Sequence, residues 1–234
     1  MQCDGTGFVS VEEGRLAAVR PCECRRAQRG DADLLKAGLP RRFLHATIES
    51  YRAGHDAQKA ALLIARRFVE DYPAVDGGLL LWGDCGSGKT HLAASILRHL
   101  ILEQGIEAAF VDFHDLLKRI QGTYGKSGEG PTEEDILEPV LSAELLVLDD
   151  LGSRRSTPWA EEVLDRLFAA RYNAQRATIL TTNLLCDDVP DAHRGMLPPG
   201  TVLLEECVGE RVLSRLHEMC RFVHVIGPDH RRSR

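Results

Sequence analysis

Apolar residues recur along this chain in two distinct patterns. Five short runs have the length of buried strands: residues 79–82, 107–111, 145–148, 178–182 and 222–226. Segments with the period of a helix lie before and between them: residues 58–72, 89–103, 113–121, 158–174 and 205–219. Short, largely apolar strands that alternate with helices are typical of a parallel sheet covered on both faces. We therefore predict a three-layer α/β fold.

The first part of the chain differs from the rest. Residues 1–45 contain three of the seven cysteines and show little apolar periodicity. We predict a division into a cysteine-bearing segment over 1–45, a linker and helix over 46–78, and the main core over 79–234. Within the core, the glycine-rich tract 122–131 is expected to be a loop.

Composition and charge limit the kinds of protein that this sequence can encode. A chain of 234 residues with 44% apolar and 27% charged residues is typical of a globular protein. The formal charge of −6 argues against a protein that coats nucleic acid or an anionic membrane by bulk attraction. No apolar run approaches the roughly 20 residues of a membrane-spanning helix, and the N-terminus lacks a secretory signal. We expect a cytoplasmic protein without a membrane partner, whose cysteines are thiols or metal ligands.

A phosphate-binding pattern is the sharpest motif. The segment 83–90 matches G-x-x-x-x-G-K-[ST] and lies between a predicted strand and a predicted helix, as this pattern requires. Its glycines let backbone N–H groups face phosphate oxygens at the N-terminus of the helix. In this pattern Lys89 contacts the β- and γ-phosphates and Thr90 binds Mg²⁺. The predicted nucleotide-binding residues are Gly83, Asp84, Cys85, Gly86, Ser87, Gly88, Lys89, Thr90 and His91.

Two adjacent carboxylates follow the predicted strand 145–148. Parallel α/β sheets bind their ligands at the carboxyl ends of the strands, so Asp149 and Asp150 are placed to reach a nucleotide. Asp149 would hold Mg²⁺ through water, and Asp150 would act as the general base on the attacking water. The alternative is a solvated turn that begins with two aspartates.

Three further residues are candidates for catalysis. Asn183 ends the strand 178–182, where its amide would hold the attacking water or sense the γ-phosphate, although an asparagine here is more commonly a turn former. Arg211 and Arg215 lie one helical turn apart. Such a pair is usually a solvated face, but an arginine that neutralises transition-state charge accelerates phosphoryl transfer. If a neighbouring copy supplied it, hydrolysis would depend on assembly.

Together these motifs resemble the bacterial replicative-helicase loaders of the DnaC/DnaI type, with the related IstB transposition ATPases, within the AAA+ superfamily. The resemblance runs from about Gly38 to the C-terminus. Its five markers, in order, are 38–43 with 46–51, then 83–92, 145–152, 181–183, and 209–212 with Arg215. It implies a P-loop sheet of order 5-1-4-3-2. Because the chain stops soon after 222–226, we expect no C-terminal helical lid.

The resemblance also implies roles for single residues. These are Walker A for Lys89 and Thr90, Walker B for Asp149 and Asp150, sensor 1 for Asn183, and the arginine finger for Arg211, with Arg215 as second choice. A second arginine sensor stays unassigned. The terminal Arg231, Arg232 and Arg234 are weak candidates for it, and the alternative is a basic tail.

The segment 113–139 is similar to the insertion through which the loaders contact single-stranded DNA. The predicted nucleic-acid residues are Lys118, Arg119, Tyr124 and Lys126. A stacked aromatic would hold a base while nearby cations follow the backbone. The alternative is a solvated loop with an incidental tyrosine.

The N-terminal cysteines resemble part of a zinc knuckle. Cys3, Cys22 and Cys24 supply three ligands, whereas a structural zinc takes four. Either His45 completes the Zn²⁺ site, or the true chain begins upstream of residue 1, or the three are free thiols. The remaining Cys186, Cys207 and Cys220 lack ligand spacing and are expected to be buried apolar residues.

The sequence therefore favours an ATPase that binds ATP and Mg²⁺, forms a homo-oligomer, and uses nucleotide state to place or release a replicative helicase on single-stranded DNA. An IstB-like target-selection ATPase is the alternative within the same fold. A non-hydrolysing nucleotide-sensing adaptor would require that Asp150 cannot reach the water. A small-molecule P-loop kinase is less compatible with the acidic pair and Asn183.

Overall fold

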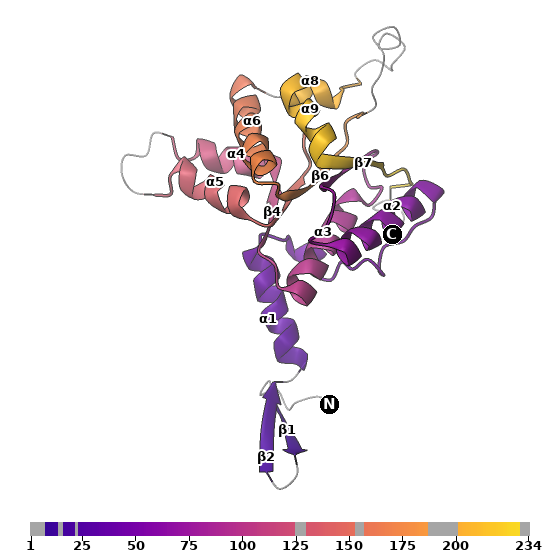
Figure 1. Cartoon of the computed structure of the whole chain (residues 1–234), viewed down its shortest axis with the longest axis vertical. Helices are drawn as coiled ribbons and strands as arrows, with labels where there is room; N and C mark the ends of the chain where they lie inside the picture. The colour runs from indigo at the N-terminus through magenta and orange to yellow at the C-terminus, as the bar shows by residue number, and fades with distance from the viewer. Residues whose placement is uncertain are drawn as a thin grey trace.

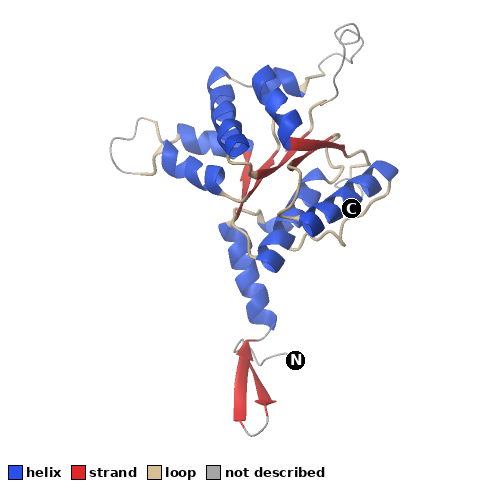
Figure 2. Cartoon of the chain, in the orientation of Figure 1, coloured by secondary structure: helices blue, strands red, loops and turns tan. Residues whose placement is uncertain are grey.

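The computed structural model describes residues 8–13, 16–21, 23–124, 130–152, 157–186 and 201–229, with side chains from residue 30 onward. Its centre is a five-stranded parallel sheet (Figure 2). Its strands are β3 (Gly78–Trp82), β4 (Ala108–Asp112), β5 (Leu145–Asp149), β6 (Ala177–Thr182) and β7 (Cys220–His224). They lie in the order β4-β5-β6-β3-β7. Numbered along the chain and read from β7, this confirms the predicted order 5-1-4-3-2.

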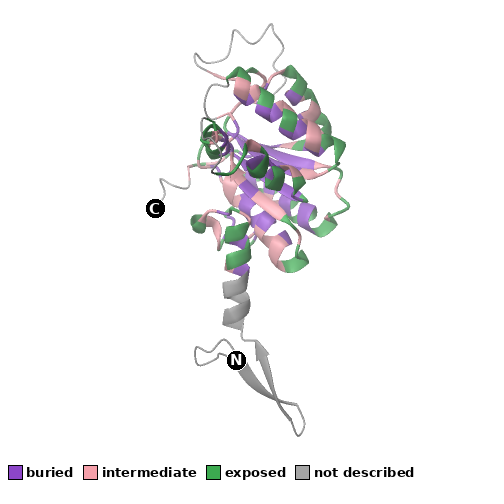
Figure 3. Cartoon of the chain, turned by 90° about the vertical axis from the view of Figure 1, so that its left-hand side faces the viewer, coloured by how far each residue is buried: buried purple, intermediate pink, exposed green. Residues whose placement is uncertain are grey.

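Both faces of the sheet are buried because side chains of a strand alternate between the faces. Leu79 and Leu81 of β3 belong to one apolar cluster, and Leu80 and Trp82 belong to a second. Figure 3 shows the buried sheet between helices whose outer surfaces are exposed. The continuous apolar runs in the sequence are therefore strands that contact helices on both sides.

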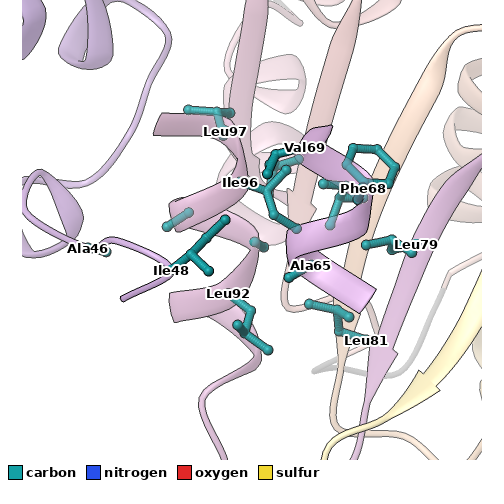
Figure 4. Packing of buried hydrophobic residues seen from close by; sticks show 14 of the residues in the cluster. Ala46, Ile48, Ala65, Phe68, Val69, Leu79, Leu81, Leu92, Ile96 and Leu97 are labelled. Carbon is teal, nitrogen blue, oxygen red and sulfur yellow. The ribbon is translucent and has the colours of Figure 1, made fainter. Parts of the chain in front are cut away.

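Helices form a layer on each face (Figure 1). The first face contacts α2 (Asp56–Asp71) and α3 (Lys89–His99), and α3 continues into the short π-helix η2 (Leu100–Gln104). In Figure 4, Phe68 of α2 lies near Ile96 of α3 within this cluster. The second face contacts α4 (Phe113–Gln121), α5 (Glu133–Ser142), α6 (Pro158–Asn173), α8 (Leu204–Val208) and α9 (Glu210–Met219).

The N-terminal elements are a hairpin and a helix that the sequence pattern did not predict. β1 (Phe8–Glu13) pairs antiparallel with β2 (Leu16–Pro21), and α1 (Glu23–Lys36) leads from the hairpin toward the sheet (Figure 1). Leu34 at the end of α1 is fully buried in the first apolar cluster. The chain then passes through the 3-10 turn η1 (Arg41–Phe43). The division of the chain at residue 45 stays a prediction, but part of the 1–45 segment contributes to the core.

Two helical segments differ from the prediction. α5 begins just after the glycine-rich tract and was not predicted. It is stabilised at its start by a capping box, in which the Thr132 hydroxyl accepts from the Asp135 N–H and the Asp135 carboxylate accepts from the Thr132 N–H. The predicted helix 205–219 is two helices, because Gly209 adopts a φ of 78° that interrupts helical geometry.

The end of the described chain runs beside the phosphate loop. After β7, the Val225 N–H donates to the Trp82 carbonyl at 2.8 Å. Residues 225–229 form no helix or strand. Across the described ranges, no helix is both long enough and apolar enough to cross a membrane.

Candidate nucleotide-binding site

The predicted phosphate loop connects β3 to α3 at the carboxyl edge of the sheet. Gly83, Gly86 and Gly88 all have positive φ, at 135°, 77° and 101°. Side chains at these positions would be strained, and a Cβ on Gly88 would overlap the ring of Tyr51. The tertiary structure and the backbone therefore both require glycine in this loop.

Lys89 is buried within the loop, with 6% of its surface exposed. Its ammonium donates to the carbonyls of Gly83 and Asp84, at 2.7 Å each. Burial lowers the pKa of Lys89, and nearby acidic groups oppose this shift. The ammonium that the motif uses to contact phosphate is therefore held beside the loop's own backbone carbonyls.

Thr90 and Asp149 are brought into direct contact. The Thr90 hydroxyl donates to Asp149 Oδ1 at 2.9 Å, and the Thr181 hydroxyl donates to the same oxygen at 2.6 Å. Asp149 is 5% exposed. Burial raises the pKa of its carboxyl, and the two hydroxyl bonds partly offset the shift. A hydroxyl and a carboxylate side by side are hard oxygen ligands of the kind that Mg²⁺ prefers.

The side chains of Asp150 and Asn183 are also in contact. The Asn183 amide donates to Asp150 Oδ1 at 3.2 Å, and the Asp150 N–H donates to the Thr181 hydroxyl at 3.0 Å. Asp150 has a φ of 59°, a conformation uncommon outside glycine but tolerated by aspartate. The two strand ends thus place the proposed base and the proposed sensor at the same edge.

Two observations bear on whether a nucleotide fits here. The Ser87 hydroxyl is buried without a hydrogen-bond partner among the described residues, which leaves a polar group for a ligand to satisfy. The hydroxyl of Thr90 and the carboxylate of Asp149 supply oxygen donors for Mg²⁺. The residues of this edge therefore fit a nucleotide with its magnesium ion.

Thr181 is a site residue that the sequence reasoning missed. Its hydroxyl donates to the Asp149 carboxylate and accepts from the Asp150 backbone N–H, and the residue is buried. The available signal was that the predicted strand 178–182 contains three threonines, of which Thr181 lies near the end that carries Asn183. A polar side chain in a fully buried strand needs a hydrogen-bond partner.

The two candidate arginines lie on α9 and face α6. Both form ion pairs with Asp165, Arg211 at 3.6 Å and Arg215 at a shorter distance. The Arg211 side chain is 76% exposed, whereas that of Arg215 is 27% exposed. Within the described part of the chain, neither arginine pairs with the phosphate loop.

The predicted nucleic-acid residues are spread over a less basic surface than expected. Lys118 on α4 is paired with Asp115, and Arg119 is exposed. The Tyr124 hydroxyl donates to Glu133 at 2.8 Å and accepts from the Trp159 indole at 3.0 Å. The bond to Glu133 raises the pKa of Tyr124. Lys126 lies outside the described residues.

The zinc hypothesis lies largely outside the described residues. Cys3 and Cys22 are not described, and Cys24 lies on α1 without a described side chain. The described residues contain no group of three His, Cys, Asp or Glu side chains placed to hold a metal. Zinc binding therefore stays a prediction. Arg231, Arg232 and Arg234 are likewise outside the description.

The other cysteines differ in how exposed they are. Cys186, Cys207 and Cys220 are buried, which confirms their predicted character, whereas Cys85 in the phosphate loop is exposed. All four are reduced thiols. Burial raises the pKa of the Cys220 thiol to about 12.

The chain is similar in sequence to known ATP-binding proteins. The model of the family described as IstB-like ATP binding protein matches residues 18–233. The replicative helicase loader DnaC of Buchnera aphidicola subsp. Schizaphis graminum (strain Sg) is 27% identical over 205 residues, which cover 88% of this chain and 76% of the relative. DnaC of Escherichia coli (strain K12) is 24% identical over 205 residues, with the same coverage of 88% and 76%.

The chain is also similar in fold to solved structures. A crystal structure of the DnaC helicase loader has a TM-score of 0.66 and 31% identity, covering 80% of this chain and all of that one. DnaI shares the fold, with a TM-score of 0.60 at 23% identity over 81% of this chain and 93% of DnaI. The initiator DnaA bound to AMPPCP and single-stranded DNA also shares the fold, with a TM-score of 0.60 at 17% identity. The match covers 79% of this chain and 50% of the DnaA chain. Family match, relatives and fold agree, and the chain belongs to the IstB-like ATP-binding family, as an AAA+ protein of the DnaC type.

Proposed function

We propose that this protein hydrolyses ATP and couples its nucleotide state to placing or releasing a replicative helicase on single-stranded DNA. The observation that carries the proposal is the convergence on one sheet edge of Thr90, Asp149 and the Asp150–Asn183 pair. The second carboxylate and its amide partner are the groups that hydrolysis needs in addition to nucleotide binding.

The proposed roles follow from position. Bound ATP with Mg²⁺ would supply the phosphoanhydride bond that is cleaved. Lys89 would hold phosphate oxygens, and Thr90 and Asp149 would hold the metal. Asp150 would accept the proton of the attacking water, and Asn183 would orient that water through its amide.

Arg211 is the better candidate for an arginine finger. Its side chain is 76% exposed near the start of α9, whereas Arg215 is 27% exposed and close to Asp165. An exposed arginine is available to a neighbouring copy, where it would stabilise the charge of phosphoryl transfer. The proposal therefore includes an ATP-dependent homo-oligomer.

The partners are proposed from the relatives. The relatives with the highest similarity reported above are replicative helicase loaders, which supports a replicative helicase as partner and a cytoplasmic place of action. Helices α4 and α5 lie beside the edge strand β4; Lys118 and Arg119 are on α4, and Tyr124 is in the turn that follows it. We assign single-stranded DNA to this surface. Target selection in transposition is the second candidate, because the matching family is described as IstB-like.

Phosphate release with and without single-stranded DNA tests the proposal. We expect turnover that responds to DNA and that Asp150→Asn abolishes. Co-purification with the replicative helicase of the same cell, with and without ATP, tests the partner. Turnover that is unaffected by both DNA and Arg211→Ala would contradict the loader mechanism, and absence of any turnover would favour a nucleotide-sensing adaptor.

A further inference from the structure

The Ser87 carbonyl of the phosphate loop receives two hydrogen bonds from outside the loop. The Tyr51 hydroxyl donates to it at 3.1 Å, and the Gln58 Nε2 donates to it at 3.0 Å. Both donors come from the segment before the sheet, far from the loop in sequence. Tyr51 is 7% exposed and Gln58 is fully buried, so neither bond competes freely with water.

The orientation of Gln58 is fixed by its own partners. Its Oε1 accepts from the Gly54 N–H at 2.9 Å and from the His55 N–H at 3.2 Å. A flipped amide would turn its NH₂ group toward these two donors, which is unfavourable. Gly227 packs against the amide so closely that a Cβ there would overlap Gln58 Nε2. The side chain is thus held with its NH₂ group directed at Ser87.

The geometry of the Ser87–Gly88 peptide links these two hydrogen bonds to the ligand. A trans peptide is planar, and its C=O and N–H point in opposite directions. A Ser87 carbonyl held toward Tyr51 and Gln58 therefore directs the Gly88 N–H away from these two residues. Because Gly88 is a glycine with a φ of 101°, its backbone would otherwise have several accessible conformations.

We propose that Tyr51 and Gln58 are positioning residues, which fix the Ser87–Gly88 peptide so that the Gly88 N–H faces the phosphate chain of a nucleoside di- or triphosphate. This rests on the proposed phosphate loop being the nucleotide site. The two residues touch no phosphate themselves. They remove the conformational cost of ordering the loop when the anion binds.

The test compares nucleotide affinity with stability in Tyr51→Phe, Gln58→Leu and the double variant. The dissociation constant of a fluorescent ADP reports the whole site, and competition by inorganic tripolyphosphate reports the phosphate contacts alone. We expect Tyr51→Phe to weaken both about 5-fold, as for loss of one neutral hydrogen bond, and the double variant to weaken both further. Melting temperature without nucleotide monitors folding.

Gln104→Leu is the matched control, because the Gln104 amide also donates to a backbone carbonyl, that of Val69 at 3.2 Å, away from the loop. It should leave both affinities unchanged. If Lys89→Ala does not weaken binding, the proposed nucleotide site is wrong. If Lys89→Ala abolishes binding while Tyr51→Phe and Gln58→Leu bind as tightly as the wild type, the site stands and the positioning role is overturned.

Discussion

At the scale of single residues, the buried carboxylate of Asp149 lowers the stability of the fold, and its proposed role in holding Mg²⁺ accounts for its presence. Its carboxylate is buried and accepts from two hydroxyls, those of Thr90 and Thr181, and the described residues place no basic side chain in an ion pair with it. A buried charge with only neutral partners destabilises a fold. The same arrangement leaves the charge available for a divalent cation.

Asp149→Asn should therefore stabilise the protein while it removes Mg²⁺-dependent hydrolysis. Because burial raises the pKa of Asp149, the charged form destabilises the fold above the raised pKa, and this cost disappears below the ordinary carboxyl pKa of about 4. Melting curves of the variant and the wild type without nucleotide should nearly coincide at about pH 4. By pH 7 the variant should melt higher, by about 2–4 °C for each kcal/mol gained. A variant that melts lower at pH 7 would contradict this account.

Thr181→Val tests the residue that bonds both the Asp149 carboxylate and the Asp150 backbone N–H. Loss of its hydroxyl removes a bond to Asp149 and the acceptor of the Asp150 N–H. We expect ATP turnover to fall about 10- to 100-fold, as for other groups that orient metal ligands. Thr178→Val is the control on the same strand, since its hydroxyl accepts from Arg171 at the opposite end of β6. It should lower the melting temperature and leave the turnover of the folded protein intact.

At the scale of elements, the α6–α9 contact decides how the arginines are presented. Asp165 on α6 pairs with both Arg211 and Arg215, and the Tyr172 hydroxyl of α6 donates to Glu218 of α9 at 2.6 Å. Exposed ion pairs are individually weak. The exposed Arg211 can therefore leave Asp165 at small cost, and the contacts of Arg215 and Tyr172 keep α9 in place.

Arg211→Ala should lower ATP turnover by about 10³-fold or more if it acts on a neighbouring copy. The loss should appear only at protein concentrations where the wild type assembles. Mixing it with Lys89→Ala should restore part of the activity, because one variant supplies the site and the other supplies the arginine. Arg66→Ala, an exposed arginine on α2, should have no effect. Wild-type turnover per molecule that does not change with protein concentration would exclude an arginine acting in trans.

At the scale of the whole molecule, the proposed nucleotide site and the proposed DNA surface occupy different elements. The phosphate loop follows β3, which lies between β6 and β7, whereas α4 and α5 flank the far edge strand β4. β5 ends in Asp149 and pairs with β4 along its whole length. Strand β5 therefore provides a rigid connection between the two regions.

Tyr124→Ala should weaken binding of single-stranded DNA by about 1–3 kcal/mol if a base stacks on the ring. Tyr172→Ala is the matched control, because Tyr172 is also exposed and also donates to a glutamate, but lies on α6 beside α9. Fluorescence anisotropy at several salt concentrations measures both. Arg119→Ala should make DNA affinity less dependent on salt concentration, by the amount expected for the loss of about one phosphate contact. Equal affinity for the two tyrosine variants would show that Tyr124 does not stack on DNA.

Much of this architecture follows from local patterns. Residues 145–148 and the Ile179–Leu180 centre of β6 are apolar because both faces of the sheet are covered, and this pattern is typical of such a sheet. The hairpin and α1 lack periodicity, and α5 begins with acidic residues and contains Pro139, so local patterns did not separate them from loops. Gly209 divides a helix through its backbone conformation, which an apolar pattern does not report.

The sequence by itself determined the fold class, the order of the strands through its family resemblance, and the positions of Lys89, Asp149 and Asn183 in motifs. These depend on spacing along the chain. Only the tertiary structure decided that Thr181 bonds the Asp149 carboxylate and the Asp150 backbone, and that Tyr51 and Gln58 hold the Ser87 carbonyl. These contacts join residues about 30 positions apart, and hydrogen bonds over such distances exist only after the sheet and its helices have packed.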